Sequence, residues 1–151
     1  MIGKNRMTIV LLALLALLLT VPALAQDSTD ADTGVVNLGG NDELGAFLVD
    51  ANAMTLYIFT NDTPSTSNCA DQCLENWPAL TVADAAELTA GAGVVGRLGT
   101  IQRDDTEALQ VTYNHMPLYL WVNDAAPGDA TGQGVGEVWF VARPQTLTLA
   151  G

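Results

Sequence analysis

"TLYIFTND" at residues 55–62 and "PLYLWVND" at residues 117–124 are nearly the same stretch written twice, 62 positions apart. Extended without gaps at that offset, residues 49–77 align with residues 111–139 and share nine identities in 29 positions. A repeat of this length that occurs twice indicates a duplicated supersecondary unit rather than a solenoid array.

The repeated stretch has the pattern of a strand buried on both sides. Alternate residues of a strand share a face, so Tyr57 and Phe59 point to one side, as do Tyr119 and Trp121 in the second copy. The leucines and isoleucine between them occupy the other side. Because both faces are apolar, the pattern predicts a central strand in each copy.

An aspartate follows each of these strands and a tryptophan closes each copy. The aspartate is expected to accept hydrogen bonds from the backbone that follows it and so fix a turn. Two interpretations of the repeated residues stay open: aromatic core, or a stacking platform for a planar or sugar ligand, since buried Tyr and Trp carry polar atoms that need partners. The residues concerned are Tyr57, Phe59, Asp62, Trp77, Tyr119, Trp121, Asp124 and Trp139.

Each copy reads as a small antiparallel meander. "AFLVD" and "MTLYIF" flank "ANA", whereas "LQVTY" and "MPLYLWV" flank "NH", and Asn tolerates the left-handed conformation of a tight hairpin. Further strands are predicted in "GVVNL", "GTIQR", "WPALTV" and "EVWFVA". We therefore predict an all-β protein in which two pseudo-symmetric meander repeats form one domain.

The domain is expected to span 35–144, with repeat 1 at about 35–82, a connection at 83–97 and repeat 2 at about 98–144. "ADAAELTAGAG" in the connection is the only stretch with helical preference, and it predicts a minor helix of about two turns ending at Gly91. The acidic segment 26–34 is predicted to be a disordered leader, and 145–151 a tail.

Residues 1–25 have the pattern of a cleavable signal peptide. Lys4 and Arg6 precede an apolar run, and Ala23-Leu24-Ala25 offers the cleavage site. The run is about 15 residues, shorter than the roughly 20 that span a bilayer. We expect export to the periplasm, cell envelope or exterior without stable membrane insertion after cleavage. No Cys follows the cleavage site, so no lipid anchor is expected there.

The net charge of the chain limits the classes of partner that it is expected to bind. Without residues 1–25 the chain has three arginines and 17 acidic residues, a net charge of −14. Nucleic acid and anionic membrane surfaces bind basic footprints, so neither is expected as a partner. An unknown small ligand, a glycan or an envelope protein remains. The acidity favours solubility, with cation binding as the alternative.

"LGAFLVDANAMTLYIFTNDTPSTSNCADQCLENWPAL", together with "RDDTEALQVTYNHMPLYLWVNDAAPGDATGQGVGEVWFVARP", resembles a bacterial secreted-repeat family of unknown function. Its members are mostly predicted lipoproteins with a duplicated Tyr-x-aromatic-x-x-Asp motif. The resemblance implies an exported β-rich repeat protein and supplies no activity. Members commonly have Gly where this chain has Ala53 and His115, so its hairpin turns are expected to differ in shape.

Cys69 and Cys73 are the only cysteines. In an exported protein they are predicted to form a disulfide, worth about 2 kcal/mol for so short a loop. The alternative is a copper(I) site made by both thiolates with His115 and Met116 or Met54.

The sequence offers little support for catalysis. No Gly-x-Ser-x-Gly elbow occurs, and Arg103-Asp104-Asp105 is expected to be a solvated turn. We therefore predict a non-enzymatic binding or interaction module of the cell envelope or extracellular space, without a cofactor. The alternative is a copper-binding or electron-transfer accessory protein that uses Cys69, Cys73, His115 and Met116.

Overall fold

The computed structural model describes residues 33–145. The predicted signal peptide, most of the leader and residues 146–151 lie outside the described residues. Gly34, which the sequence places at the end of a disordered leader, is buried, and its N–H donates to Asn37 Oδ1 at 2.7 Å. The ordered fold therefore begins earlier than residue 35, because these polar contacts pin the chain before the first strand.

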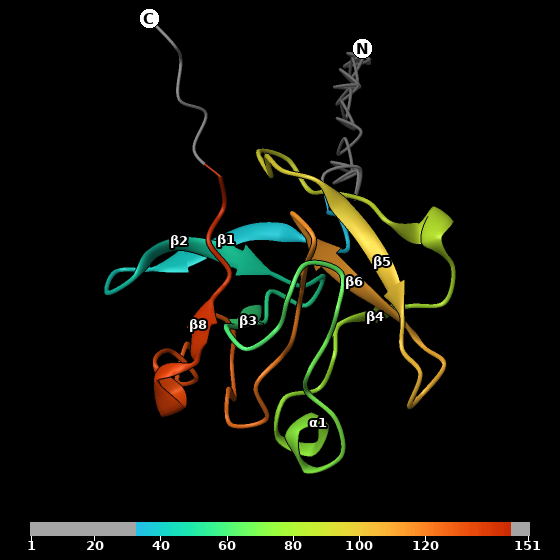
Figure 1. Ribbon diagram of the computed structural model, residues 1–151. Coiled ribbons are helices and arrows are strands. Elements are labelled where there is room, and N and C mark those ends of the chain that lie inside the picture. Colours follow the sequence, from blue (N-terminus) through green and yellow to red (C-terminus); the bar gives the residue numbers. More distant parts are fainter. Residues whose placement is uncertain (1–32, 146–151) are drawn as a thin grey trace, which may run out of the picture.

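Most regular elements of the described chain are strands, as the sequence predicts, and Figure 1 shows these short strands, α1 and the long loops that connect them. The named strands all pair antiparallel. They are β1 (Asn37–Asn41), β2 (Gly45–Val49), β3 (Tyr57–Phe59), β4 (Thr81–Val82), β5 (Leu98–Gln102), β6 (Leu109–Tyr113), β7 (Met116–Pro117) and β8 (Trp139–Val141). The helical turns are α1 (Gln72–Asn76), η2 (Ala85–Glu87) and η3 (Val135–Glu137).

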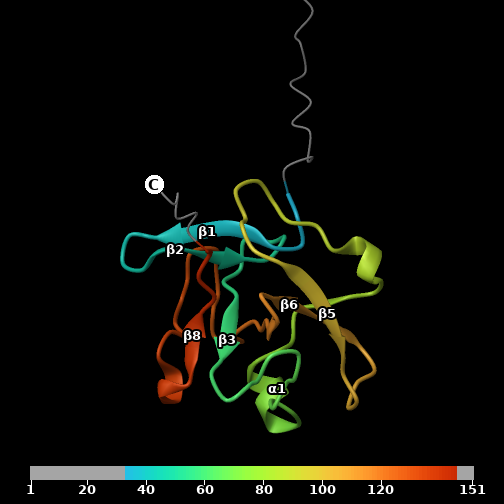
Figure 2. The same cartoon turned by 45° about the horizontal axis from the view of Figure 1, so that its top comes forward.

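The two repeats exchange strands. β3 of repeat 1 pairs with β8 of repeat 2, and Figure 2 shows these strands side by side. The equivalent pairing in the other direction joins Tyr119 to Ala79. Between the exchanged pairs, Tyr57 N–H donates to Tyr119 O at 2.8 Å and Tyr119 N–H donates to Tyr57 O at 3.0 Å. The pseudo-two-fold axis therefore passes between these two tyrosines.

The central strands separate two apolar clusters. Leu56 and Leu118 are fully buried on one side, and Tyr57 and Tyr119 are fully buried on the other. Burial of one large apolar side chain contributes about 1.5–3 kcal/mol, so both faces matter to stability. The prediction of a strand covered on both sides is confirmed.

The gapless alignment that pairs Val49 with Val111 is wrong by one residue before the hairpin. Leu48 N–H donates to Ala142 O, and Val111 N–H makes the equivalent bond to Leu80 O, both at 2.8 Å. Leu48 is therefore the structural counterpart of Val111. The reason is one extra residue in the first hairpin turn.

The two hairpin turns, one in each repeat, differ in length and in backbone conformation. In the second, Asn114 (φ 50°) and His115 (φ 72°) are both left-handed, as a two-residue hairpin requires. In the longer first turn, Ala53 (φ 62°) takes the left-handed position and Asn52 does not. Ala53 and His115 are the positions at which the family resemblance implies Gly, and both are left-handed here. That these turns differ in shape from those of other family members stays a prediction.

The minor helix predicted in the connection is present, but it is shorter than the two turns expected. The connection contains η2, a single 3₁₀ turn capped by Asp84, whose Oδ1 accepts from Ala86 N–H at 2.8 Å. Beyond it the chain is drawn out, because Val35 N–H donates to Thr89 O and Gly91 N–H donates to Val36 O. This tertiary pairing outweighs a weak helical preference. The α-helix, α1, lies in repeat 1, at the place where repeat 2 has η3.

Candidate functional site

Each repeated tyrosine is hydrogen bonded to the aspartate of the other repeat. Tyr57 Oη donates to Asp124 Oδ2 at 2.6 Å, and Tyr119 Oη donates to Asp62 Oδ2 at 2.7 Å. All four side chains are buried. The Tyr-x-aromatic-x-x-Asp motif is therefore satisfied only when both copies are present.

The second carboxylate oxygen of each aspartate fixes the loop that follows it. Asp62 Oδ1 accepts from Asn68 N–H at 2.6 Å. Asp124 Oδ1 accepts from the N–H of Thr131 at 2.9 Å and from its hydroxyl at 2.7 Å. The expected contact with the following backbone is present in both copies.

Burial keeps the two phenols of these pairs protonated. It raises the pKa of Tyr57 and Tyr119 above the ordinary range, and hydrogen bonding to the aspartates raises both further. Burial also raises the pKa of Asp62. The phenols are therefore protonated donors at neutral pH, and the aspartates act as their acceptors.

Four rings of the motif form one continuous stack. The order is Phe59, Trp139, Trp77 and Trp121, with centroid separations of 4.3, 3.9 and 4.0 Å and interplanar angles of 12°, 3° and 26°. The order is symmetric, since Phe59 is equivalent to Trp121 and Trp77 to Trp139. Stacking at such distances adds about 0.5–1.5 kcal/mol per pair beyond the area buried.

The stack decides between the two interpretations of the aromatic residues for its central members. Trp77 and Trp139 are only 4% exposed and belong to the core. Phe59 and Trp121, at the two ends, are half-buried. The hypothesis of a stacking platform therefore applies only to these terminal rings.

The cysteines do not offer thiolates in this structure. Cys69 and Cys73 are joined in a disulfide, as predicted, and Cys69 is fully buried against the aromatic cluster. His115 lies exposed at the tip of the β6–β7 turn, and Met116 is half-buried in β7. Within residues 33–145, no group of three or more His, Cys, Asp and Glu side chains could hold a metal ion.

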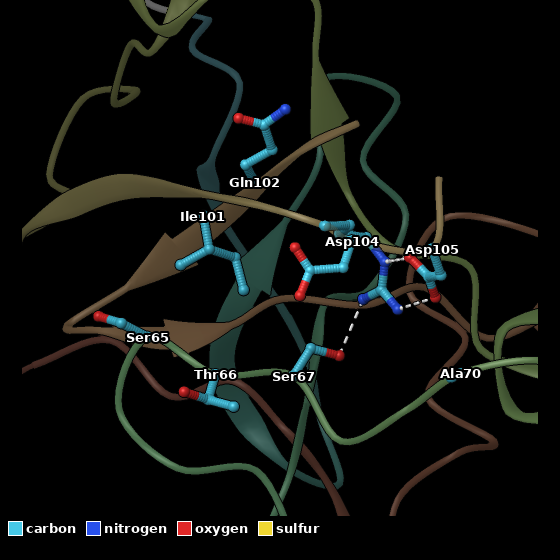
Figure 3. A pocket seen from close by; sticks show the side chains of 9 residues that line it. Ser65, Thr66, Ser67, Ala70, Ile101, Gln102, Asp104 and Asp105 are labelled. Atoms are coloured by element: carbon cyan, nitrogen blue, oxygen red, sulfur yellow. Dashed lines mark hydrogen bonds and ion pairs between the residues drawn. The ribbon is translucent and has the colours of Figure 1, made fainter. Parts of the chain in front are cut away.

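The most chemically varied surface feature was not found by sequence reasoning. It is a hollow of about 330 Å³ at the end of β5, called here the Arg103 hollow and drawn in Figure 3. Hydroxyl, amide, carboxylate and guanidinium groups from two distant segments meet there. Its lining residues are Ser65, Thr66, Ser67, Ala70, Ile101, Gln102, Arg103, Asp104 and Asp105.

Arg103 is buried, and the expectation of a solvated turn is wrong for it. Its side chain is 4% exposed, and Asp105 holds it with hydrogen bonds of 2.9 and 2.7 Å. Nη1 donates to Ser67 Oγ at 2.8 Å and to Gln110 Oε1 at 2.6 Å, while Nη2 donates to Cys69 O at 2.6 Å. These hydrogen bonds compensate for the desolvation of the buried guanidinium. The guanidinium also lowers the pKa of Asp105. Gln110, a long polar side chain that β6 buries completely, was the signal that could have revealed such a partner.

Asp104 and Asp105 differ in their surroundings. Among the described residues the single ion pair is Arg103–Asp105, so the Asp104 carboxylate has no cationic partner there. Figure 3 shows the Asp104 carboxylate directed toward the space between Ile101 and Ser67. In the hollow, the charge of Arg103 is therefore neutralised by Asp105, and the Asp104 carboxylate is left to contact a ligand.

Repeat symmetry places a second hollow, of about 440 Å³, around Asn41. Asn41 stands where repeat 2 has Arg103, and its Nδ2 donates to Gly128 O at 3.0 Å. This hollow also contains Glu43, Asp129 and Thr131. The guanidinium is thus a feature of one half of the molecule.

The chain belongs to a family described as a secreted repeat of unknown function. The family model matches it twice, at residues 40–81 and 99–143, so each copy falls within one predicted repeat. No curated protein and no solved structure matches the chain. Within residues 33–145, no helix has the length and apolar character to cross a membrane.

Proposed function

We propose that the chain is an exported, non-enzymatic binding module that holds a polar ligand in the Arg103 hollow. The observation that carries this proposal is the Asp104 carboxylate, which has no cationic partner among the described residues and lines a hollow together with hydroxyl and amide side chains and the Asp105-paired Arg103. The volume lies at the lower end of the range for small-molecule sites, roughly 300–1,000 Å³.

The chemistry of the hollow favours a hydroxyl-bearing ligand with a positive charge. Ser65, Thr66 and Gln102 can donate to and accept from hydroxyl groups, and Asp104 can accept from an ammonium group. The strongly acidic surface attracts cations as well. A short amino sugar has both features.

The Ser67 hydroxyl, which lines the Arg103 hollow, is poorly suited to nucleophilic catalysis. An activated serine needs a neighbouring base, but Ser67 Oγ accepts from the Arg103 guanidinium at 2.8 Å and contacts Tyr119 Oη at 2.6 Å. A cationic neighbour and a protonated phenol do not remove its proton. This arrangement supports binding rather than turnover. No contact of the described residues favours the copper alternative, which requires a reduced Cys69–Cys73 pair.

The test is calorimetric titration of the exported chain with a trimer of β-linked glucosamine, using its N-acetylated form as the uncharged comparison. We expect the charged trimer to bind and Asp104→Asn to weaken it about tenfold, the effect of losing one charged hydrogen bond of about 1.4 kcal/mol. Asp42→Asn is the matched control, because it removes the same charge from an exposed residue outside the hollow. Equal weakening in both variants, or binding of neither trimer, would overturn the proposal.

A further inference from the structure

We propose that the aromatic stack and its two Tyr–Asp pairs form a redox site that passes an oxidising equivalent from the surface to a buried tyrosine. The reaction partner is a one-electron oxidant in solution. The inference does not depend on a ligand in the Arg103 hollow.

The stack provides a continuous path for an electron. Trp121 is the half-buried end of the stack. The centroid of its ring lies 4.0 Å from that of Trp77, and the centroids of Trp77 and Trp139 are 3.9 Å apart, with an interplanar angle of 3°. Indole is among the more easily oxidised side chains, and face-to-face contact couples the ring π-systems. Oxidation at Trp121 can therefore spread into the buried rings without any movement of the chain.

Each buried indole in turn contacts a tyrosine edge-on. Tyr57 lies 5.3 Å from Trp77, and Tyr119 lies 5.1 Å from Trp139, measured between ring centroids. A phenol gives up an electron readily only when its proton can leave at the same time. The hydroxyls of Tyr57 and Tyr119 meet this condition, since each already donates to a carboxylate at 2.6 or 2.7 Å, within the reach of a general base.

The electrons and protons balance at each step. Trp121 gives one electron to the oxidant, which is reduced. Trp77 then gives one electron to the oxidised Trp121. Tyr57 then gives one electron to the oxidised Trp77, and the Tyr57 O–H bond breaks as its proton moves to Asp124 Oδ2. The products are the reduced oxidant, a neutral tyrosyl radical and a protonated aspartic acid. The symmetric branch runs through Trp139 to Tyr119, whose proton moves to Asp62.

The chain contains its own control. Tyr113 is also buried, at 5% exposed, but its hydroxyl donates to the backbone carbonyl of Val95. A carbonyl does not accept a proton as a carboxylate does. Tyr113 is also absent from the stacked and edge-on ring contacts described above. It should therefore remain unoxidised when Tyr57 and Tyr119 react.

The experiment is flash photolysis of the exported chain with a soluble ruthenium polypyridyl photo-oxidant and a sacrificial quencher. We expect an indole radical signal that decays into a phenoxyl radical signal, more slowly in heavy water than in light water. The phenoxyl signal should be lost when Tyr57→Phe and Tyr119→Phe are combined, and retained in Tyr113→Phe. Asp62→Asn combined with Asp124→Asn should leave the indole radical in place, because an amide cannot take the proton.

Near-ultraviolet circular dichroism of the indole stack shows which variants are folded. If the double variants do not fold, the isotope effect and freeze-trapped electron paramagnetic resonance of the unmodified chain carry the test. A phenoxyl radical that survives both Phe substitutions but disappears in Tyr113→Phe would overturn the proposal. An indole radical that never passes to tyrosine in the unmodified chain would do so as well.

Discussion

Tyr57 of the first repeat and Asp124 of the second are joined by a buried hydrogen bond of 2.6 Å, although 67 positions separate them in the chain. The reciprocal bond joins Tyr119 to Asp62. Neither repeat satisfies its own aspartate with its own tyrosine. The motif is therefore a device for joining two copies, which explains why the sequence contains it twice.

The reciprocal pairing predicts an energetic coupling between repeats. In a double-mutant cycle of Tyr57→Phe with Asp124→Ala, we expect a coupling free energy of about 1.5–3 kcal/mol, typical of a buried hydrogen bond to a charged group. The measurement is the free energy of unfolding from urea titration of each single variant and the double variant.

The matched control pairs the same tyrosine with the aspartate of its own repeat. Tyr57→Phe with Asp62→Ala should be additive within about 0.5 kcal/mol, because these two side chains do not share a hydrogen bond. A larger coupling within one repeat than between repeats would contradict the exchanged arrangement.

Burial of Asp62 predicts a pH dependence of stability. Because burial raises the pKa of Asp62 above its ordinary value of 3.8, the folded chain takes up this proton at a higher pH than the unfolded chain does. Stability therefore rises as pH falls from above the raised pKa toward 3.8. The measurement is the free energy of unfolding against pH for the unmodified chain and for Asp62→Asn.

The difference between those two curves isolates the carboxyl group. Asp105 has the opposite sign, since Arg103 lowers its pKa, and its contribution is lost as pH falls below 3.8. Asp105 is present in both proteins, so it cancels. Curves that run parallel from neutral pH to pH 4 would contradict the prediction.

What the sequence could predict was local. The side of the strand on which Tyr57 and Phe59 lie follows from the two-residue period of any strand. The Cys69–Cys73 disulfide follows from spacing and export. The first inference needs only neighbouring residues, the second needs the cysteine spacing and the export signal at residues 1–25, and both agree with the structure.

What the sequence could not predict depends on distant partners. A meander closed within one copy and one that exchanges β8 with β3 bury the same apolar pattern, so periodicity cannot separate them. Likewise Arg103 is followed by two aspartates and reads locally as a solvated turn. Its burial is decided by Ser67 and Cys69, more than thirty positions earlier in the chain.

Arg103 should therefore be costly to remove. Arg103→Met removes the guanidinium donor from the oxygens of Ser67, Cys69 and Gln110, and we expect a loss of about 3 kcal/mol in the free energy of unfolding. Arg103→Lys should recover little, because an ammonium group cannot reproduce the guanidinium fork. Arg97→Met, at an exposed position, is the control and should change stability by less than about 0.5 kcal/mol. Similar losses at both positions would show that the Arg103 contacts contribute nothing particular.

The hairpin turns predict a gain in stability. Ala53 and His115 both have left-handed backbone conformations, with φ of 62° and 72°, which cost a side-chain-bearing residue about 1–2 kcal/mol and glycine almost nothing. Glycine also adds unfolded-state entropy, so the net gain from Ala53→Gly or His115→Gly should be about 0.5–1 kcal/mol. The control is Ala51→Gly in the same turn. Because Ala51 is not among the positive-φ residues, only the entropic cost applies there, and stability should fall. Thermal and urea unfolding of the three variants decide the matter, and a loss at all three positions would mean that neither turn is strained.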